Sequence, residues 1–174
     1  MLPYGPKDFA NAFLTVRNNT IKAAEEIPEE QYDFSPAPGG RTVRQLLTHI
    51  AFGNEFNRKA QGDRLTTLKG FDFPAFIGPL MAEEQKPRTK AELLALLRSR
   101  GDEFAAWLGG LDEAMLAERI EMPQPGETKT RFEMLLGVKE HEMHHRGQLM
   151  ISQRLVGITP HLTRAMMERM AARS

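Results

Sequence analysis

Signals for helix starts constrain this chain more than any other feature of its sequence. Three times a threonine is followed, three residues later, by a glutamine or glutamate, and each pair opens a series of apolar residues at helical spacing. Two such side chains satisfy backbone N–H groups that are otherwise free at the start of a helix. The pattern therefore predicts three helices that begin at these threonines. The pairs are Thr42 with Gln45, Thr89 with Glu92, and Thr130 with Glu133.

An earlier helix is indicated by apolar spacing alone. Residues three or four apart give one apolar face over residues 9–27, and Pro28 ends the series because proline does not continue a helix. The face consists of Phe9, Phe13, Val16, Thr20, Ala23 and Ile27. Together with the three capped helices, this segment makes four.

Glycines and loss of periodicity place the ends of the later helices. We expect the second helix over residues 42–60, the third over 89–110 and the fourth over 131–156. Residues 66–88 lose the pattern in a stretch rich in Phe, Gly and Pro, which predicts a long connection with at most one short helix. Residues 161–174 would add one more short helix. Since no segment alternates like a strand, the sequence predicts an all-α four-helix bundle with long connections.

Length and charge exclude several classes of protein. A chain of 174 residues supports one core, so we expect a single domain over residues 1–174. The 23 basic residues balance the 23 acidic residues without a basic cluster, which argues against a nucleic-acid partner. The N-terminus lacks a leader pattern, and no apolar run approaches membrane-spanning length. We therefore expect a cytoplasmic protein with no membrane partner.

Three of the five histidines lie within the segment HEMHH, residues 141–145. His141 and His145 are one turn apart, so their imidazoles share one face of the fourth helix, while His144 points elsewhere. Glu142 belongs to a polar stripe that we expect to face solvent, so the two histidines face inward. A single inward histidine is usually satisfied by hydrogen bonds, whereas two on one face favour a metal ion. The stripe consists of Lys139, Glu142, Arg146 and Gln153.

A third ligand has to come from another helix, because two imidazoles seldom hold a metal ion alone. The chain has no cysteine, which leaves His, Asp and Glu as ligands. His49 lies in the second helix on the same face as Leu46, and Gly53 one turn later leaves space beside it. His161 follows Pro160 near the C-terminus, where we expect a surface residue. The sequence therefore predicts a divalent-metal site built from His49, His141 and His145 in the bundle interior.

The same residues satisfy H-E-x-x-H, the helix motif of zinc metalloproteases. The extended protease motif requires glycine at position 148, where this chain has Gln148. The other protease form requires a later acidic ligand, and Glu168 near the C-terminus is the one acidic residue after Glu142. We expect Glu142 to pair with Arg146 across one turn rather than to act as a general base. A protease is therefore the less favoured alternative.

Two long motifs resemble one known family. The segments TVRQLLTHIAFGNEF and HEMHHRGQLMISQRLVGITP are similar to those of the DinB/YfiT-like superfamily of metal-binding four-helix bundles, and the likeness covers nearly the whole chain. The resemblance implies helices in the order up, down, down, up and a divalent ion, such as Zn, Ni or Fe, held by three histidines. These correspond to His49, His141 and His145, with His144 outside the ligand set.

Members of this superfamily include thiol-dependent transferases and a mycothiol-dependent isomerase. A divalent ion with three imidazole ligands keeps positions open at which a water or a thiol can ionise. Because this chain lacks cysteine, a thiol would have to come from a small cosubstrate of low molecular weight. We expect a metal-dependent enzyme that transfers a small thiol or hydrolyses a small molecule. The alternative is a metal-bound stress-response or structural binding module without turnover.

Two further expectations concern residues outside the ligand set. Gln148 lies beside His145 and is suited to orienting a substrate by hydrogen bonds, because an amide does not transfer protons readily. The apolar segments 71–81 and 166–170 exceed what a bundle core requires, so they could form the surface of a homodimer. Their alternative role is to cap the ends of the bundle.

Overall fold

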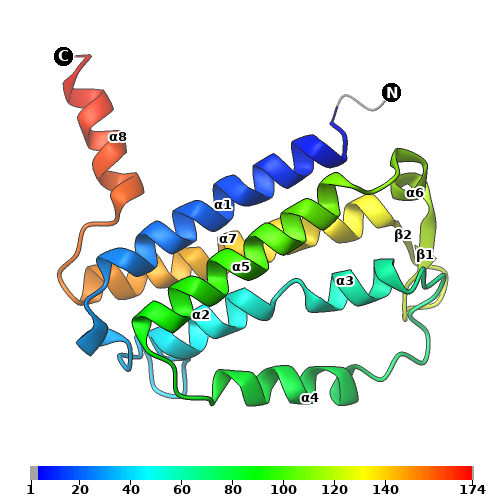
Figure 1. Ribbon diagram of the computed structural model, residues 1–174, viewed down its shortest axis with the longest axis horizontal. Helices are drawn as coiled ribbons and strands as arrows, with labels where there is room; N and C mark the ends of the chain where they lie inside the picture. Colours follow the sequence, from blue (N-terminus) through cyan, green and yellow to red (C-terminus); the bar gives the residue numbers. More distant parts are fainter. Residues whose placement is uncertain (1–3, 174) are drawn as a thin grey trace.

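Four long helical segments form the body of the structure, a computed structural model that describes residues 4–173 (Figure 1). Each of the three capping boxes is present, at Thr42, Thr89 and Thr130. The four helices expected from the sequence are therefore confirmed. They are α1 (Pro6–Glu26), α2 (Val43–Phe52) continued by α3 (Glu55–Gly62), α5 (Lys90–Gly109) and α7 (Arg131–Leu155).

The second helix differs from its prediction because it is interrupted. The backbone N–H of Gly53 bonds the carbonyl of Ile50 at 3.3 Å, which ends α2, and α3 starts after Asn54. Glycine and asparagine both have low helix propensity, so a break costs little at this position. The segment ends close to its expected limit at residue 60, because α3 ends at Gly62.

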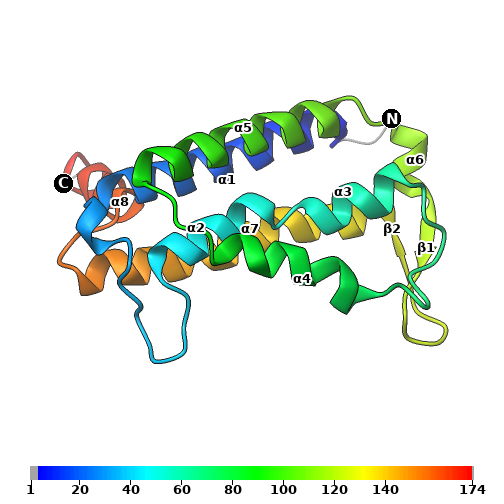
Figure 2. The same cartoon turned by 60° about the horizontal axis from the view of Figure 1, so that its bottom comes forward.

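Contacts between distant residues fix the directions of the helices. Near their starts, α1 and α7 are joined by the rings of Phe9 and Phe132, and near their ends Gln153 donates to the Ala23 carbonyl. These two helices therefore run in the same direction. Figures 1 and 2 show α2, α3 and α5 running the opposite way, so the order along the chain is up, down, down, up.

The connections carry more structure than the sequence pattern predicts. The stretch 66–88 contains one helix, α4 (Phe73–Glu84), which lies beside α2 and α3 outside the four-helix core (Figure 2). The remaining short elements are η1 (Glu29–Gln31), α6 (Glu113–Ala117) and an antiparallel pair of strands, β1 (Arg119–Glu121) with β2 (Thr128–Thr130). The expectation of no strand was wrong, because three-residue strands are too short to show alternation.

The helix expected after residue 160 is present as α8 (His161–Ala171), which projects from the bundle near the end of α1 (Figure 1). It carries exposed Met166, Met167 and Met170, and α4 carries exposed Ile77 and Met81. A homodimer built on these surfaces stays a prediction. Among the described residues, no helix is both long and apolar enough to cross a membrane.

A buried arginine connects all four helices at the middle of the bundle. Arg17 of α1 is 2% exposed, and its Nε donates to both carboxylate oxygens of Glu142 in α7, at 2.9 and 3.1 Å. Its Nη1 donates to the Leu97 carbonyl of α5 at 2.8 Å, and its Nη2 to the Ile50 carbonyl of α2 at 3.3 Å. Apolar clusters fill the interior on either side of this ion pair. Arg17 thereby ties α2 and α7 to one another.

The predicted solvent side of α7 was wrong. Glu142 is 2% exposed and pairs with Arg17, and Gln153 is buried against α1. Met143 and Ile151 are exposed instead. The polar stripe was misplaced because a polar side chain can be buried when another helix supplies its partner, which local spacing does not show.

Candidate metal centre

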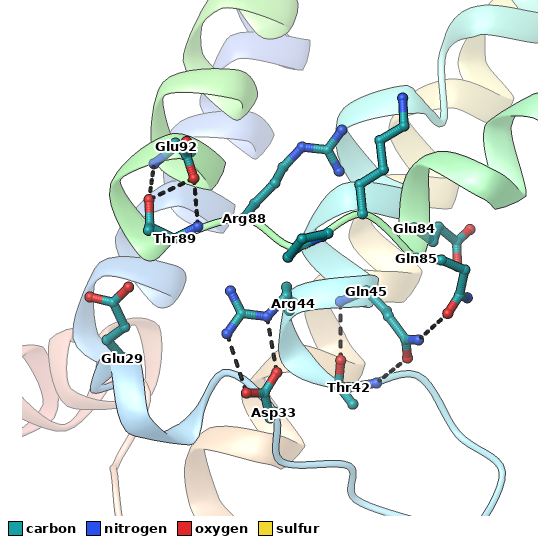
Figure 3. Close-up of a pocket in the computed structure, with 12 residues that line it drawn as sticks. Glu29, Asp33, Thr42, Arg44, Gln45, Glu84, Gln85, Arg88, Thr89 and Glu92 are labelled. Carbon is teal, nitrogen blue, oxygen red and sulfur yellow. Dashed lines mark hydrogen bonds and ion pairs between the residues drawn. The ribbon is translucent and has the colours of Figure 1, made fainter.

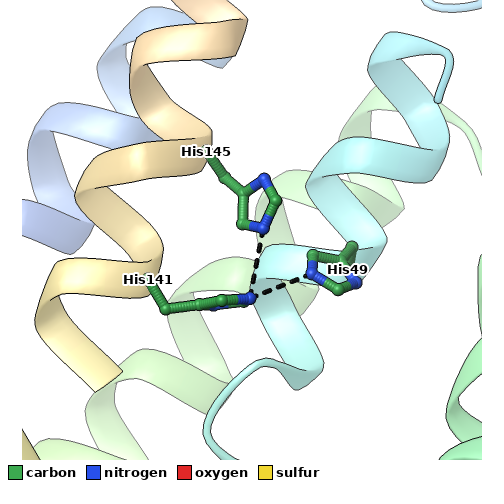
Figure 4. A group of neighbouring side chains, drawn as sticks. All are labelled: His49, His141 and His145. Carbon is green, nitrogen blue, oxygen red and sulfur yellow. Dashed lines mark hydrogen bonds between the residues drawn. The ribbon is translucent and has the colours of Figure 1, made fainter. Parts of the chain in front are cut away.

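The three predicted ligands come together between α2 and α7 (Figure 4). The Nε2 atom of His141 lies 3.1 Å from Nε2 of His49 and 3.1 Å from Nε2 of His145. One ligand nitrogen from each ring lies within 4.8 Å of the other two. Nitrogens that bind one zinc ion at about 2.0–2.1 Å are roughly 3.3 Å apart in a tetrahedral site. The spacing of these nitrogens therefore suits a single ion.

The outer nitrogens of two rings are occupied by hydrogen bonds. His49 Nδ1 donates to Glu84 Oε1 at 2.8 Å, and His145 Nδ1 donates to Gln148 Oε1 at 2.8 Å. When these two rings are neutral, the Nε2 atoms of His49 and His145 each carry a lone pair that points toward His141. One N–H of His141 cannot satisfy both lone pairs equally, whereas a cation accepts all three. The donor set therefore fits a divalent metal ion.

A glycine in α2 makes room for His141. A Cβ atom at Gly53 would lie 2.8 Å from both Cε1 and Nδ1 of the His141 ring. Real Cβ contacts are not that short, so a side chain at this position would displace the ring. The sequence pattern indicated space beside His49, and the His141 ring occupies that space.

Burial keeps the three imidazoles neutral. It lowers the pKa of His141 to about 4, with further contributions from His145 and His49. Burial also lowers the pKa of His49 and of His145, although the hydrogen bonds that these rings donate to Glu84 and Gln148 oppose the shift. A metal ion binds the neutral imidazole, so these rings need not release protons at pH 7 to bind one.

Glu84 is the site residue that the sequence pattern did not reveal. It ends α4, is 8% exposed, and accepts bonds from His49 and from Nε of Arg41, the latter at 2.7 Å. Nothing in the spacing of residues 66–88 marks it, because its partner lies in another helix. Glu55, an acid near His49 in sequence, instead pairs with Arg100.

Two other histidines lie outside the cluster. His144 is exposed, and its Nε2 accepts a bond from Gln148 Nε2 at 3.2 Å. His161 was expected at the surface, but it is 6% exposed and its Nε2 donates to Asn19 Oδ1 at 3.2 Å. The expectation failed because α8 begins against α1, a contact that the sequence does not show. Neither histidine belongs to the three-histidine group.

One pocket is lined by two of the three histidines, and a second pocket adjoins it. The first, of about 330 Å³, has His49 and His141 on its wall and is otherwise mainly apolar. The second, of about 810 Å³, lies toward residues 36–41 and includes Gln148. Arg41, Met81 and Glu84 border both. The apolar part of the first pocket consists of Phe52, Gly53, Phe56, Phe76, Ile77, Leu80 and Met81.

A third pocket, of about 580 Å³, lies where α2 and α5 begin (Figure 3). None of the three histidines lines it. Its Arg44 pairs with Asp33, and its Arg88 pairs with Glu83. These cations are neutralised by their neighbours. The three histidines therefore remain the candidate functional site.

The fold and the cluster together define a helical-bundle protein with a three-imidazole centre between two of its helices. A model of the DinB superfamily matches residues 12–149. The chain therefore belongs to the DinB superfamily, as its motifs suggested.

A relative of known sequence matches most of this chain, and two solved structures share its fold. YjoA of Bacillus subtilis is 27% identical over 148 residues, which cover 84% of this chain and 88% of YjoA. The solved structure of YfiT from B. subtilis has a TM-score of 0.69 at 20% identity and covers 91% of each chain. YfiT is described as a probable metal-dependent hydrolase with an unusual four-helix bundle topology. A DinB-like protein from Bacillus cereus gives a TM-score of 0.69 at 18% identity, covering 91% of this chain and 97% of its own.

Proposed function

We propose that this protein binds one divalent metal ion through His49, His141 and His145 and acts as a metal-dependent hydrolase of a small molecule. The observation that carries the proposal is the convergence of three Nε2 atoms, two of them 3.1 Å from the third. The description of YfiT supports the reaction class. When bound, such an ion lowers the pKa of a water or thiol bound to it.

The chain's own residues hold the imidazoles in place. Glu84 and Gln148 bond the outer nitrogens of His49 and His145, which fixes the orientation of each ring and leaves its Nε2 free to bind a metal. Gln148 therefore positions a ligand, whereas the sequence suggested that it orients substrate.

The glutamate of the H-E-x-x-H motif has no role as a base in this proposal. Both carboxylate oxygens of Glu142 accept bonds from Arg17 in the bundle interior, away from the pockets. In a protease of that motif, the glutamate activates water beside the metal. The buried ion pair therefore argues against the protease alternative.

The substrate binds in the pocket bordered by His49 and His141. Its mainly apolar lining suits a molecule with an apolar body whose reactive group lies against the imidazoles. Transfer of a small thiol to such a molecule is the second candidate. Because the chain has no cysteine, the thiol would be a cosubstrate.

The test compares the metal-stripped and the reloaded protein on a panel of aryl esters and amides, with and without an added small thiol. Hydrolysis that needs metal but no thiol supports the proposal, and turnover only with thiol selects the transferase. His141→Ala should abolish turnover, whereas the control variant of exposed His144 to alanine should retain it. A fully loaded protein inactive under both conditions would favour a binding module without turnover.

A further inference from the structure

Arg41 stands at the border of the two pockets beside the histidines. It precedes the cap residue of α2, and its side chain is 38% exposed, so one side of the guanidinium faces the pockets or solvent. The carboxylate of Glu84 bonds both Arg41 and His49, so the guanidinium is linked to the candidate metal centre.

Glu84 holds this guanidinium in a fixed orientation. Nε and Nη2 of Arg41 donate to the two carboxylate oxygens at 2.7 and 3.3 Å, and the same carboxylate accepts from His49. Within residues 4–173, no protein acceptor bonds Nη1 of Arg41. A guanidinium has five N–H donors, so donors remain for a ligand. Holding it in advance reduces the entropy lost when that ligand binds.

The charges around the pockets favour a negatively charged ligand. Apart from histidines, Arg41 and Glu84 are the charged residues that line either pocket, and they neutralise one another. No other carboxylate or lysine lines these pockets in the described part of the chain. With a divalent ion bound, the site would carry an excess of positive charge beside the single guanidinium of Arg41. A guanidinium binds a planar carboxylate through two parallel N–H groups, so the two match in size and charge.

We propose that the substrate is an organic carboxylate with an apolar body, whose carboxylate is bound by Arg41 while its body fills the pocket lined by Phe52, Phe76 and Leu80. This inference rests on the proposed function, because it names the substrate class of the same site. Arg41 is then a substrate-binding residue, and Glu84 positions both Arg41 and His49.

The test measures binding of benzoate and of benzamide, its neutral analogue, to the full cobalt-loaded chain by calorimetry. The visible absorption of cobalt reports metal occupancy separately. Benzoate should bind about tenfold more tightly than benzamide, as expected for one charged hydrogen-bonded pair. Arg41→Gln should remove this preference while benzamide binding and cobalt uptake persist, and Arg41→Lys should retain part of it.

Arg44→Gln is the matched control. Arg44 pairs with Asp33 and lines the pocket of Figure 3 but neither of the pockets that Arg41 borders, so this variant should keep the full preference for benzoate. Equal affinities in the wild type, or a preference that survives in Arg41→Gln, would overturn the inference. Failure of the wild type to take up cobalt would overturn the proposed function instead. The same comparison on the metal-free chain would then decide the role of Arg41, because its pairing with Glu84 requires no metal.

Discussion

At the scale of single residues, the chain shows how far side-chain spacing can predict a site. His141 and His145 were predicted as a pair because both lie on one helix, and His49 because it was the other inward histidine. Glu84 and the burial of Glu142 were not predicted, since each depends on a partner from a distant segment, Arg41 or Arg17. Helical spacing identifies residues on a shared face but not the residues that lie opposite that face.

Glu142→Gln should lower the free energy of unfolding by about 3 kcal/mol, because it leaves the buried guanidinium of Arg17 without its counter-charge. A glutamate paired with Arg146 at the surface, as the sequence predicted, would contribute far less to stability. Urea denaturation measures the change. The control variant Glu140→Gln, on the exposed side of the same helix, should change stability by less than about 0.5 kcal/mol. Equal stability of the two variants would show that the ion pair is not buried.

Glu84→Gln should weaken metal affinity roughly 10- to 100-fold, because it removes the carboxylate that orients His49. Competition with a chromophoric chelator gives the affinity directly. Its neighbour Glu83 pairs with Lys86 and Arg88, away from the histidines, so Glu83→Gln should bind metal like the wild type. Equal losses in both variants would point to a general effect of changing α4.

At the scale of elements, the starts of the helices were predictable and their interruptions were not. Thr42, Thr89 and Thr130 each cap a helix as expected, because a capping box is a local interaction. Low helix propensity at Gly53 and Asn54 permits a break after Phe52 but does not require one, and the docking of α4 depends on other segments. Phe56 of α3 packs against Phe71, Phe73 and Phe76, which holds the start of α4, and Glu84 holds its end.

Gly53→Ala tests whether the glycine at the break between α2 and α3 is needed to make room for the His141 ring. The added methyl group would lie 2.8 Å from the His141 ring, so we expect a loss of about 1–3 kcal/mol in stability together with weaker metal binding. Gly147→Ala is the control, since no heavy atom lies within 4 Å of its added methyl group and it should stabilise α7 by about 0.5–1 kcal/mol. Unchanged metal affinity in Gly53→Ala would show that the ring has room to move.

At the scale of the whole molecule, the three histidines of the cluster, of which His145 is buried and the other two are half-buried, connect stability to pH. The pKa of His141 is lowered to about 4, and those of His49 and His145 are lowered as well. The unfolded chain takes up protons near the ordinary histidine pKa of about 6.5. Between about pH 6.5 and pH 4, the unfolded state therefore binds more protons than the folded state, and metal-free stability is full above this window and falls as pH decreases through it.

The urea midpoint of the metal-free protein, measured at about pH 7 and pH 5, tests this dependence, because the histidines of the unfolded chain titrate between these values. The midpoint should fall on acidification, and His141→Ala should reduce the difference between the two values. His144→Ala, which changes an exposed ring, should leave the difference as in the wild type. A midpoint that rises on acidification would contradict the neutral state assigned to the cluster.

The metal content of the purified protein, prepared without a histidine tag, tests the central claim most directly. Elemental analysis should find one divalent ion per chain, and His49→Ala, His141→Ala and His145→Ala should each lose it, because each removes one of the three converging Nε2 atoms. His144→Ala should retain the ion. Full occupancy in His49→Ala would show that α7 binds metal without α2, and it would contradict a centre shared between the two helices.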